Sequence, residues 1–268
     1  MATSVIVCGA AGRMGRTLVE LIAQASDLKI TGAVELAGHQ AIGRDVGSLA
    51  GLPDLGVIVG SDFRAVASPD AVGLDFTNAA AAVEHLRIAV EQGTAMVVGS
   101  TGFTQSQQAE LDQLAPRTRC VVSPNMSVGV AVLQRLVGEA SKALGPDFDP
   151  EIIEMHHRTK IDAPSGTALA LARTVAAASG RDVAKDAVYG REGIVGQRQH
   201  HELAVLALRG GDVVGDHTVI FAGVGERLEL THRAQSRDSL ARGALRAARW
   251  VIHQPVGRYS MHDVLGWH

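Results

Sequence analysis

The chain has 268 residues, of which 46% are hydrophobic and 20% charged, and its net charge is -3. This composition is typical of a globular protein with one large domain or two ordinary ones. There is no basic stripe, and no apolar run approaches the roughly 20 residues that span a bilayer. We therefore expect neither a nucleic-acid partner nor a membrane.

The N-terminal residues lack the basic start and separate apolar region of a signal peptide, so we expect a cytoplasmic protein. The two cysteines, Cys8 and Cys120, each lie in a strand-like segment. We interpret them as buried thiols rather than as a disulfide framework.

The first half of the chain alternates strand-like and helix-like patterns. Strands are predicted at residues 4–8, 29–34, 57–59, 72–76, 95–98 and 119–122, with helices at 13–25, 79–92 and 105–114. Such alternation predicts a parallel sheet with helices on both faces, an α/β fold.

The pattern changes after Asn125. Helices are predicted at residues 128–144, 167–178 and 239–253, and strands at 151–157, 203–209, 217–221 and 227–232. The glycines at 223 and 225 predict a hairpin between the last two strands. We predict an α+β second domain with a mostly antiparallel sheet.

A glycine-rich turn follows the first predicted strand and begins the first helix. Gly9, Gly12 and Gly15 allow the backbone to turn sharply and approach a pyrophosphate, which the free N–H groups of a helix N-terminus attract. Glu35 ends the second strand, where an acid binds the adenosine ribose. An ordinary strand–turn–helix with incidental glycines is the alternative, and we favour a dinucleotide site because strand, glycines, helix and acid agree.

Further polar segments follow three later strands, at residues 75–77, 99–102 and 123–126. Ligands of open α/β sheets bind at the carboxyl ends of the strands, so these segments are candidate cofactor contacts. Each could equally be a plain turn.

The densest group of chemically active side chains lies at residues 154–167. His156, His157, Arg158 and Lys160 are followed by Ser165-Gly-Thr, which begins a helix. Cations beside a helix N-terminus favour a carboxylate ligand, and lysine or histidine can donate a proton.

Other interpretations of this segment remain open. Adjacent histidines can ligate zinc, but no third ligand has a familiar spacing, so we expect no metal. A basic run is often a solvated surface, and Ser165 suits a helix cap as well as a nucleophile.

Residues 151–168 closely resemble the signature of the 4-hydroxy-tetrahydrodipicolinate (dihydrodipicolinate) reductase family. The resemblance extends to residues 7–15 and 232–238, and to the segments at 75–77, 99–102 and 123–129. It implies a nicotinamide enzyme of the diaminopimelate route to lysine. The implied fold is an N-terminal Rossmann domain, residues 1–126 with 238–268, and an α+β substrate and tetramerisation domain, residues 127–237. A homotetramer is the implied assembly.

The resemblance also implies roles for individual residues. His156 and Lys160 match the proton donors, and His157, Gly166 and Thr167 match contacts to the dicarboxylate substrate. The implied contacts to NADH or NADPH are Gly9, Ala10, Ala11, Gly12, Arg13, Met14, Glu35, Gly99, Ser100, Thr101, Ser123, Pro124, Asn125 and Met126.

Two positions depart from the family pattern. Leu36 stands where many members have an arginine that meets the 2′-phosphate of NADPH, and Ser100 stands where threonine is commoner. Leu36 favours a turn that accepts NADH, although Arg13 or Arg16 could meet a phosphate.

Two other functions are compatible with part of the sequence pattern. A homoserine- or aspartate-type dehydrogenase would share the glycine turn but gives no account of the His-His-Arg-x-Lys block. A domain that senses NADH without catalysis would be expected to have lost His156 or Lys160, and both are present.

Overall fold

The computed structural model describes residues 2–236 and 238–267. The chain divides into two compact units, Met1–Ser127 with Asp238–His268, and Val128–Arg237. Arg237, which belongs to the C-terminal part of the resemblance, lies outside the described residues together with Met1 and His268.

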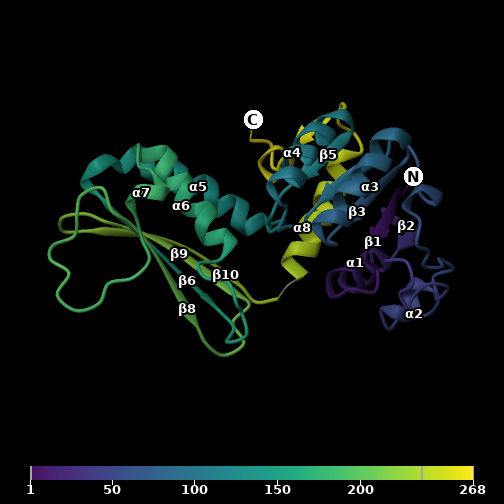
Figure 1. Ribbon diagram of the computed structural model, residues 1–268, viewed down its shortest axis with the longest axis horizontal. Helices are drawn as coiled ribbons and strands as arrows, with labels where there is room; N and C mark the ends of the chain where they lie inside the picture. The colour runs from purple at the N-terminus through teal and green to yellow at the C-terminus, as the bar shows by residue number, and fades with distance from the viewer. Residues whose placement is uncertain (1, 237, 268) are drawn as a thin grey trace. The chain divides into compact units, whose positions relative to one another are not determined.

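The first unit contains a six-stranded parallel sheet in the order β11-β5-β4-β3-β1-β2 (Figure 1). Its strands are β1 (Thr3–Cys8), β2 (Leu28–Val34), β3 (Ala71–Asp75), β4 (Ala95–Val98), β5 (Arg119–Val122) and β11 (Gly257–Tyr259). Its helices are α1 (Arg13–Ala23), α2 (Val46–Leu49), α3 (Ala79–Gln92), α4 (Gln105–Leu114), α8 (Asp238–Val251) and α9 (Met261–Val264). The predicted α/β fold is confirmed.

Helices cover both faces of this sheet because its strands are apolar on both sides. Ile6 and Cys8 of β1 pack into one core with Leu86 of α3 and Leu111 of α4. On the other side α8 contacts α1 as well as β4 and β5. The C-terminal helix therefore completes the layer that begins with α1.

Local signals set the helix ends. Asn78 caps α3 by accepting a hydrogen bond from the backbone N–H of Ala81, and Gly93 ends that helix with a φ of 71°. Residues 57–59 do not form the predicted strand, and Ile58 makes one isolated bridge, to Asp45, instead. The Asp45 carboxylate accepts hydrogen bonds from the backbone N–H groups of Leu55 and Val57, which holds this segment in a loop.

The second unit contains a five-stranded sheet in the order β10-β9-β6-β8-β7, covered on one face by α5 and α6 (Figure 1). Its strands are β6 (Asp149–His156), β7 (Ala187–Val188), β8 (Leu203–Arg209), β9 (Gly215–Ala222) and β10 (Arg227–Ala234). Its helices are α5 (Val128–Leu144), α6 (Gly166–Ser179) and α7 (Val183–Asp186). The three short 3₁₀ helices described in the chain are Phe63–Ala65, Ala115–Arg117 and Gly145–Asp147.

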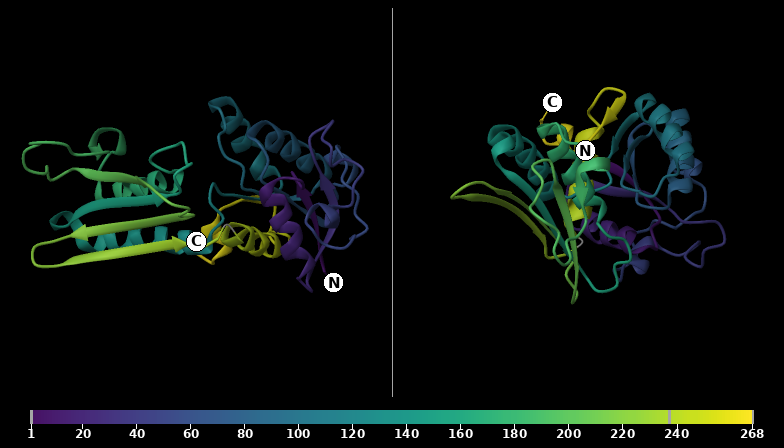
Figure 2. Two further views of the ribbon diagram at one scale, coloured as in Figure 1. Left: turned by 90° about the horizontal axis from the view of Figure 1, so that it is seen from below. Right: turned by 60° about the vertical axis from the view of Figure 1, so that its left-hand side comes forward.

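The predicted antiparallel pairing holds for β9 and β10, but the prediction missed that β8 and β7 pair in parallel, which makes the sheet mixed. β6 pairs with β8 and β7 with β8 in parallel, whereas β9 runs antiparallel to β6 and β10. The crossover from β6 through α6 is long enough to return the chain in the same direction, which the strand patterns alone do not reveal. The predicted hairpin is present, and Figure 2 shows β9 and β10 side by side up to their turn.

Candidate active site and cofactor turn

The glycine turn, residues 9–15, is shaped by close backbone approaches. Gly9 has a φ of 72°, a conformation that favours glycine. A Cβ on Gly15 would lie 2.2 Å from the carbonyl oxygen of Gly9, so only glycine allows α1 to pack this closely on the turn. Gly12 is the N-cap of α1, and because it has no side chain it does not cap the first N–H groups of the helix. The N–H groups of the first turn of α1, including those of Arg13 and Met14, are suited to an anion.

Glu35 is fixed beside this turn. Its carboxylate accepts hydrogen bonds from the backbone N–H groups of Ala11, at 3.0 Å, and Leu36, at 3.1 Å. The Leu36 side chain is 71% exposed and carries no charge. Arg16 donates from Nε to the carbonyl oxygen of Ala11 at 3.0 Å, which leaves its charge near the turn. Ala10 is buried behind the turn.

The other predicted cofactor contacts follow neighbouring strands, Gly99, Ser100 and Thr101 after β4, and Ser123, Pro124, Asn125 and Met126 after β5. The strands are parallel, so their carboxyl ends meet at one edge of the sheet, where β1 also ends. A Cβ on Gly99 would lie 2.1 Å from the Phe76 ring. Ser123 Oγ donates to the carbonyl oxygen of Asn125 at 2.7 Å, which closes the turn after β5.

A buried carboxylate joins the ends of β3 and β4. Asp75 Oδ1 accepts hydrogen bonds from the hydroxyls of Thr77 and Ser100, and Asp75 Oδ2 lies 2.6 Å from His85 Nδ1. Burial raises the pKa of Asp75, but the hydrogen bond and charge of His85 outweigh it and hold the pKa below its ordinary value.

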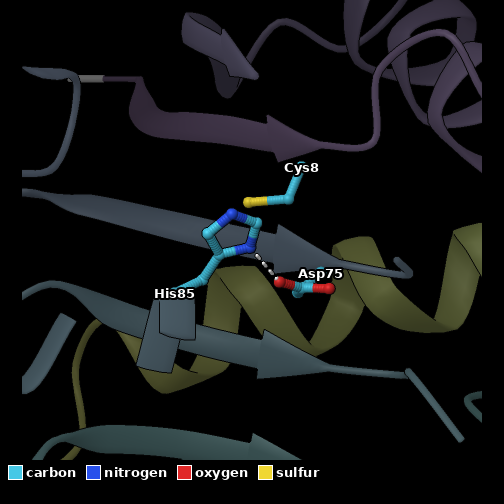
Figure 3. Close-up of side chains that lie close together, drawn as sticks. All are labelled: Cys8, Asp75 and His85. Carbon is cyan, nitrogen blue, oxygen red and sulfur yellow. Dashed lines mark hydrogen bonds and ion pairs between the residues drawn. The ribbon is translucent and has the colours of Figure 1, made fainter. Parts of the chain in front are cut away.

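Cys8 completes this cluster (Figure 3). Its Sγ, an Asp75 oxygen and a His85 nitrogen lie within 4.8 Å of one another, a grouping that could ligate a metal ion. Burial, followed by the charges of Asp75 and Glu35, raises the pKa of the Cys8 thiol well above its ordinary value. Because the thiol keeps its proton and both Asp75 oxygens have partners, we interpret the group as a hydrogen-bonded Asp75–His85 pair beside a buried thiol. Cys8 and Cys120 are both free and buried, as predicted.

In the second unit, one buried carboxylate organises the predicted catalytic segment. Glu154 is 0% exposed, and its Oε2 lies 2.6 Å from His156 Nδ1. Arg209 at the end of β8 donates to both Glu154 oxygens at 2.8 and 2.9 Å. The backbone N–H of Ser165 donates to Oε1 at 3.0 Å. We call Glu154, His156, Ser165, Arg209 and His217 the His156 cluster.

Charge and burial in this cluster favour ionised Glu154 and neutral His217. Burial raises the pKa of Glu154, but the hydrogen bonds of Arg209, His156 and Ser165 outweigh it and lower the pKa. Burial, followed by the charge of His156, lowers the pKa of His217 to about 4. His217 Nε2 lies 3.0 Å from the Ser165 hydroxyl, and its Nδ1 has no hydrogen-bond partner among the described residues.

Lys160 lies in the loop between β6 and α6. Its Nζ donates to both carboxylate oxygens of Asp162 at 2.7 and 2.8 Å. Arg209 also donates to the carbonyl oxygen of Asp162 at 2.6 Å, which ties this loop to the His156 cluster. His157 Nδ1 lies 2.8 Å from the Thr159 hydroxyl.

Ser165 caps α6 by accepting a hydrogen bond from the backbone N–H of Ala168. Gly166 is the first residue of the helix and Thr167 the second. The fold therefore brings His156 and the N-terminus of α6 to the same carboxylate, Glu154. A helix N-terminus beside arginine and lysine is suited to a carboxylate ligand.

Sequence reasoning did not assign a role to Glu154, Arg209, His217 or His85. Glu154 and His156 are buried and alternate with partly buried positions along β6, so they occupy sites where a strand normally places apolar side chains toward the core. His217 occupies such a site on β9. A polar side chain at a core-facing position is the signal that could have identified them.

Comparison with known proteins identifies the family of this chain. Residues 3–126 match the family model described as "Dihydrodipicolinate reductase, N-terminus", and residues 129–265 match the corresponding C-terminus. The chain belongs to the dihydrodipicolinate reductase family. It is 52% identical over 260 residues to the 4-hydroxy-tetrahydrodipicolinate reductase of Syntrophobacter fumaroxidans, covering 97% of each chain. It is 52% identical over 263 residues to that of an Anaeromyxobacter species, covering 98% of this chain and 97% of the other.

Solved structures share the fold of this family member. A dipicolinate-bound dihydrodipicolinate reductase from Paenisporosarcina sp. TG-14 has a TM-score of 0.76 at 24% identity, covering 98% of this chain and 99% of the other. An amine dehydrogenase from Mycobacterium smegmatis has a TM-score of 0.62 at 17% identity, covering 97% of this chain and 95% of the other. At these identities the likeness shows the fold alone. No helix within the described residues is long and apolar enough to cross a membrane.

Proposed function

We propose that this protein reduces 4-hydroxy-tetrahydrodipicolinate to tetrahydrodipicolinate, with loss of water, in the diaminopimelate route to lysine. One observation carries the proposal. In a chain of this family, the buried Glu154 holds both a histidine and the N-terminus of α6, beside a lysine. That grouping provides proton donors next to a site for carboxylates.

Membership of the family implies a nicotinamide cofactor, and the residues of the first unit fit one. Gly9 allows the sharp turn after β1, and Gly15 lets α1 pack directly on that turn, so the N-terminus of α1 can face a pyrophosphate. The Glu35 carboxylate, held by the Ala11 N–H, is available to ribose hydroxyls. The segments after β4 and β5 supply the remaining contacts. When bound, the nicotinamide supplies a hydride to the substrate ring.

The exposed Leu36 supports a preference for NADH. A 2′-phosphate beside Leu36 would find no cation at that position, although Arg16 near the turn could attract it. We therefore propose that NADH is used at least as well as NADPH.

The second unit binds the substrate in this proposal. His157 and the N–H groups of Gly166 and Thr167 hold its two carboxylates, because a helix N-terminus and cations favour negative charge. As electrons move toward the ring nitrogen, the positive charge of Lys160 stabilises the developing negative charge. His156 or Lys160 then donates the proton that completes the reduction.

The assembly and location follow from family resemblance. We propose a homotetramer built through the second unit, and a cytoplasmic protein. The two free buried thiols agree with a reducing compartment. Sedimentation or light scattering of the purified protein tests the tetramer.

The decisive experiment is an NADH-absorbance assay with substrate freshly made from pyruvate and aspartate semialdehyde. We expect oxidation of NADH that depends on the substrate, and the same assay with NADPH gives the cofactor preference. Binding of NADH without oxidation would overturn the proposal in favour of a sensor. Oxidation with homoserine or aspartate semialdehyde alone would favour another dehydrogenase.

A further inference from the structure

We propose that Glu154 is a positioning residue that fixes the tautomer of His156, keeping the proton on Nδ1 and leaving Nε2 for the substrate. This inference rests on the proposed function, because it assigns His156 the proton donor's role. Glu154 acts through His156 and does not itself touch the substrate.

The hydrogen bonds determine which nitrogen carries the proton. The pKa of Glu154 is lowered, so its carboxylate is ionised at neutral pH and can only accept hydrogen bonds. At 2.6 Å from Oε2, His156 Nδ1 must therefore be the donor. A neutral imidazole with its proton on Nδ1 has a free lone pair on Nε2.

The other ring nitrogen, His156 Nε2, lies beside Gly215, and the His156 side chain is 11% exposed. A Cβ on Gly215 would lie 3.0 Å from His156 Nε2, so a side chain at that position would crowd the nitrogen. Nε2 can take a proton from water and give it to the reduced ring. The Nδ1 proton stays between His156 and Glu154 throughout, and the carboxylate stabilises the transient imidazolium.

Glu154 is itself held so firmly that it can orient the ring. Arg209 donates to both oxygens, and the Ser165 N–H donates to Oε1. The pair with Arg209 balances the buried charge, which would be costly alone. Glu154 thereby links three parts of the site, namely His156, the N-terminus of α6, and, through Arg209, the carbonyl of Asp162 in the lysine loop.

Glu154→Gln makes a sharp test because the geometry dictates how the amide must turn. Two groups that can only donate, Arg209 Nη2 and the Ser165 N–H, point at Oε1, whereas one such group, Arg209 Nη1, points at Oε2. The amide oxygen therefore belongs at the Oε1 position, and the hydrogen bond from Arg209 Nη1 is lost. The amide NH₂ then occupies the Oε2 position and faces His156 Nδ1. Since NH₂ only donates, Nδ1 must become the acceptor, and the proton moves to Nε2.

The tautomer is measured from the imidazole nitrogen shifts of ¹⁵N-histidine protein, assigned with a His156→Gln variant. We expect Nδ1–H in the wild type and Nε2–H in Glu154→Gln. We also expect kcat to fall by about 10²- to 10⁴-fold, the range for losing acid–base catalysis, with the Kd for NADH unchanged. A structural role alone would not exchange the protonated nitrogen.

Glu151→Gln is the matched control. Glu151 lies on the same strand and is paired with Arg191 and Arg198, but it has no hydrogen bond to His156. We expect Glu151→Gln to keep the His156 tautomer and kcat. Circular dichroism and thermal unfolding check that each variant folds.

Three results would overturn the inference: a wild-type proton on Nε2, an unchanged tautomer in Glu154→Gln, or an unchanged kcat in that variant. If Glu154→Gln does not fold, the wild-type tautomer still decides, together with Arg209→Lys, which should keep Nδ1–H. If the wild type binds NADH but reduces no substrate, the proposed function fails, whereas the tautomer measurement still tests the role of Glu154.

Discussion

The glycine turn and the His156 cluster show two ways to build a site. The turn works through its backbone, since Gly9 and Gly15 contribute by having no side chain and α1 offers N–H groups. The His156 cluster works through buried side chains, and its charges are balanced within the second unit.

The two sites should therefore fail in different ways. An added methyl group should disrupt the turn, because it would clash with backbone atoms of the turn that now pack against the glycine. Removing one charged group should disrupt the cluster, because the hydrogen-bond partners of that group would remain buried without it. Four substitutions, taken from the largest expected effect to the smallest, test this contrast.

Lys160→Ala should have the largest effect on turnover. It removes the ammonium group that pairs with Asp162 and, in our proposal, stabilises or protonates the reduced ring. We expect kcat to fall by about 10²- to 10⁴-fold in the NADH assay. Lys185→Ala, an exposed lysine of α7 outside the candidate site, serves as the control. Near-normal turnover of Lys160→Ala would contradict the assignment.

His217→Gln should change how stability depends on pH. The pKa of His217 is about 4 in the folded protein, against an ordinary value of 6.5, so the unfolded chain binds more protons between these values. The stabilisation is complete above pH 6.5 and is lost as the pH falls to 4, by up to about 3 kcal/mol.

The measurement for His217 is the Tm across this pH range. Wild-type Tm should fall more steeply with acidification than that of His217→Gln, which can still bond to Ser165. His200→Gln, in an exposed loop, should follow the wild type. Parallel curves for all three proteins would mean that His217 does not titrate in the way its burial implies.

Gly15→Ala should weaken cofactor binding. Its Cβ would lie 2.2 Å from the Gly9 carbonyl oxygen and 2.8 Å from the Ala10 Cα, so the turn or α1 must move. Overpacking of this kind costs about 1–3 kcal/mol. When the whole cost falls on cofactor binding, the Kd for NADH rises roughly 5- to 150-fold. NADH titration measures the change. Gly190→Ala is the control, because Gly190, like Gly15, has no positive φ, but nothing lies within 4 Å of its added Cβ.

Leu36→Arg should have the smallest effect and should be specific to NADPH. It places a cation next to Glu35, where a 2′-phosphate would lie. One charged hydrogen bond at this exposed position is worth about tenfold in the KM for NADPH. The KM for NADH should hardly change, and Leu36→Gln separates charge from side-chain size. An equal gain for both cofactors would show that the 2′-phosphate does not lie there.

The sequence predicts the two sites to different degrees, because the turn is formed by one short stretch of chain and the His156 cluster by residues from several strands. The turn could be predicted because its glycines, the strand before them and Glu35 follow one another in a short stretch. Lys160 and His156 were singled out by local density of polar residues. Arg209 and His217 come from other strands, and only the sheet register brings them to Glu154.

The same limit explains the errors in the fold. Strand and helix positions follow from local periodicity, and most of them are confirmed. The direction of β8 relative to β6 depends on the crossover through α6, which local pattern does not encode. Residues 57–59 look like a strand, but the Asp45 carboxylate takes the backbone N–H of Val57.

The most direct test of the contrast between the two sites is the Kd for NADH in Lys160→Ala and Gly15→Ala, measured by the same titration as the wild type. If the backbone turn alone holds the cofactor, Lys160→Ala should match the wild type while Gly15→Ala binds roughly 5- to 150-fold more weakly. Equal affinity in Gly15→Ala and the wild type, or an equal loss in both variants, would contradict this account.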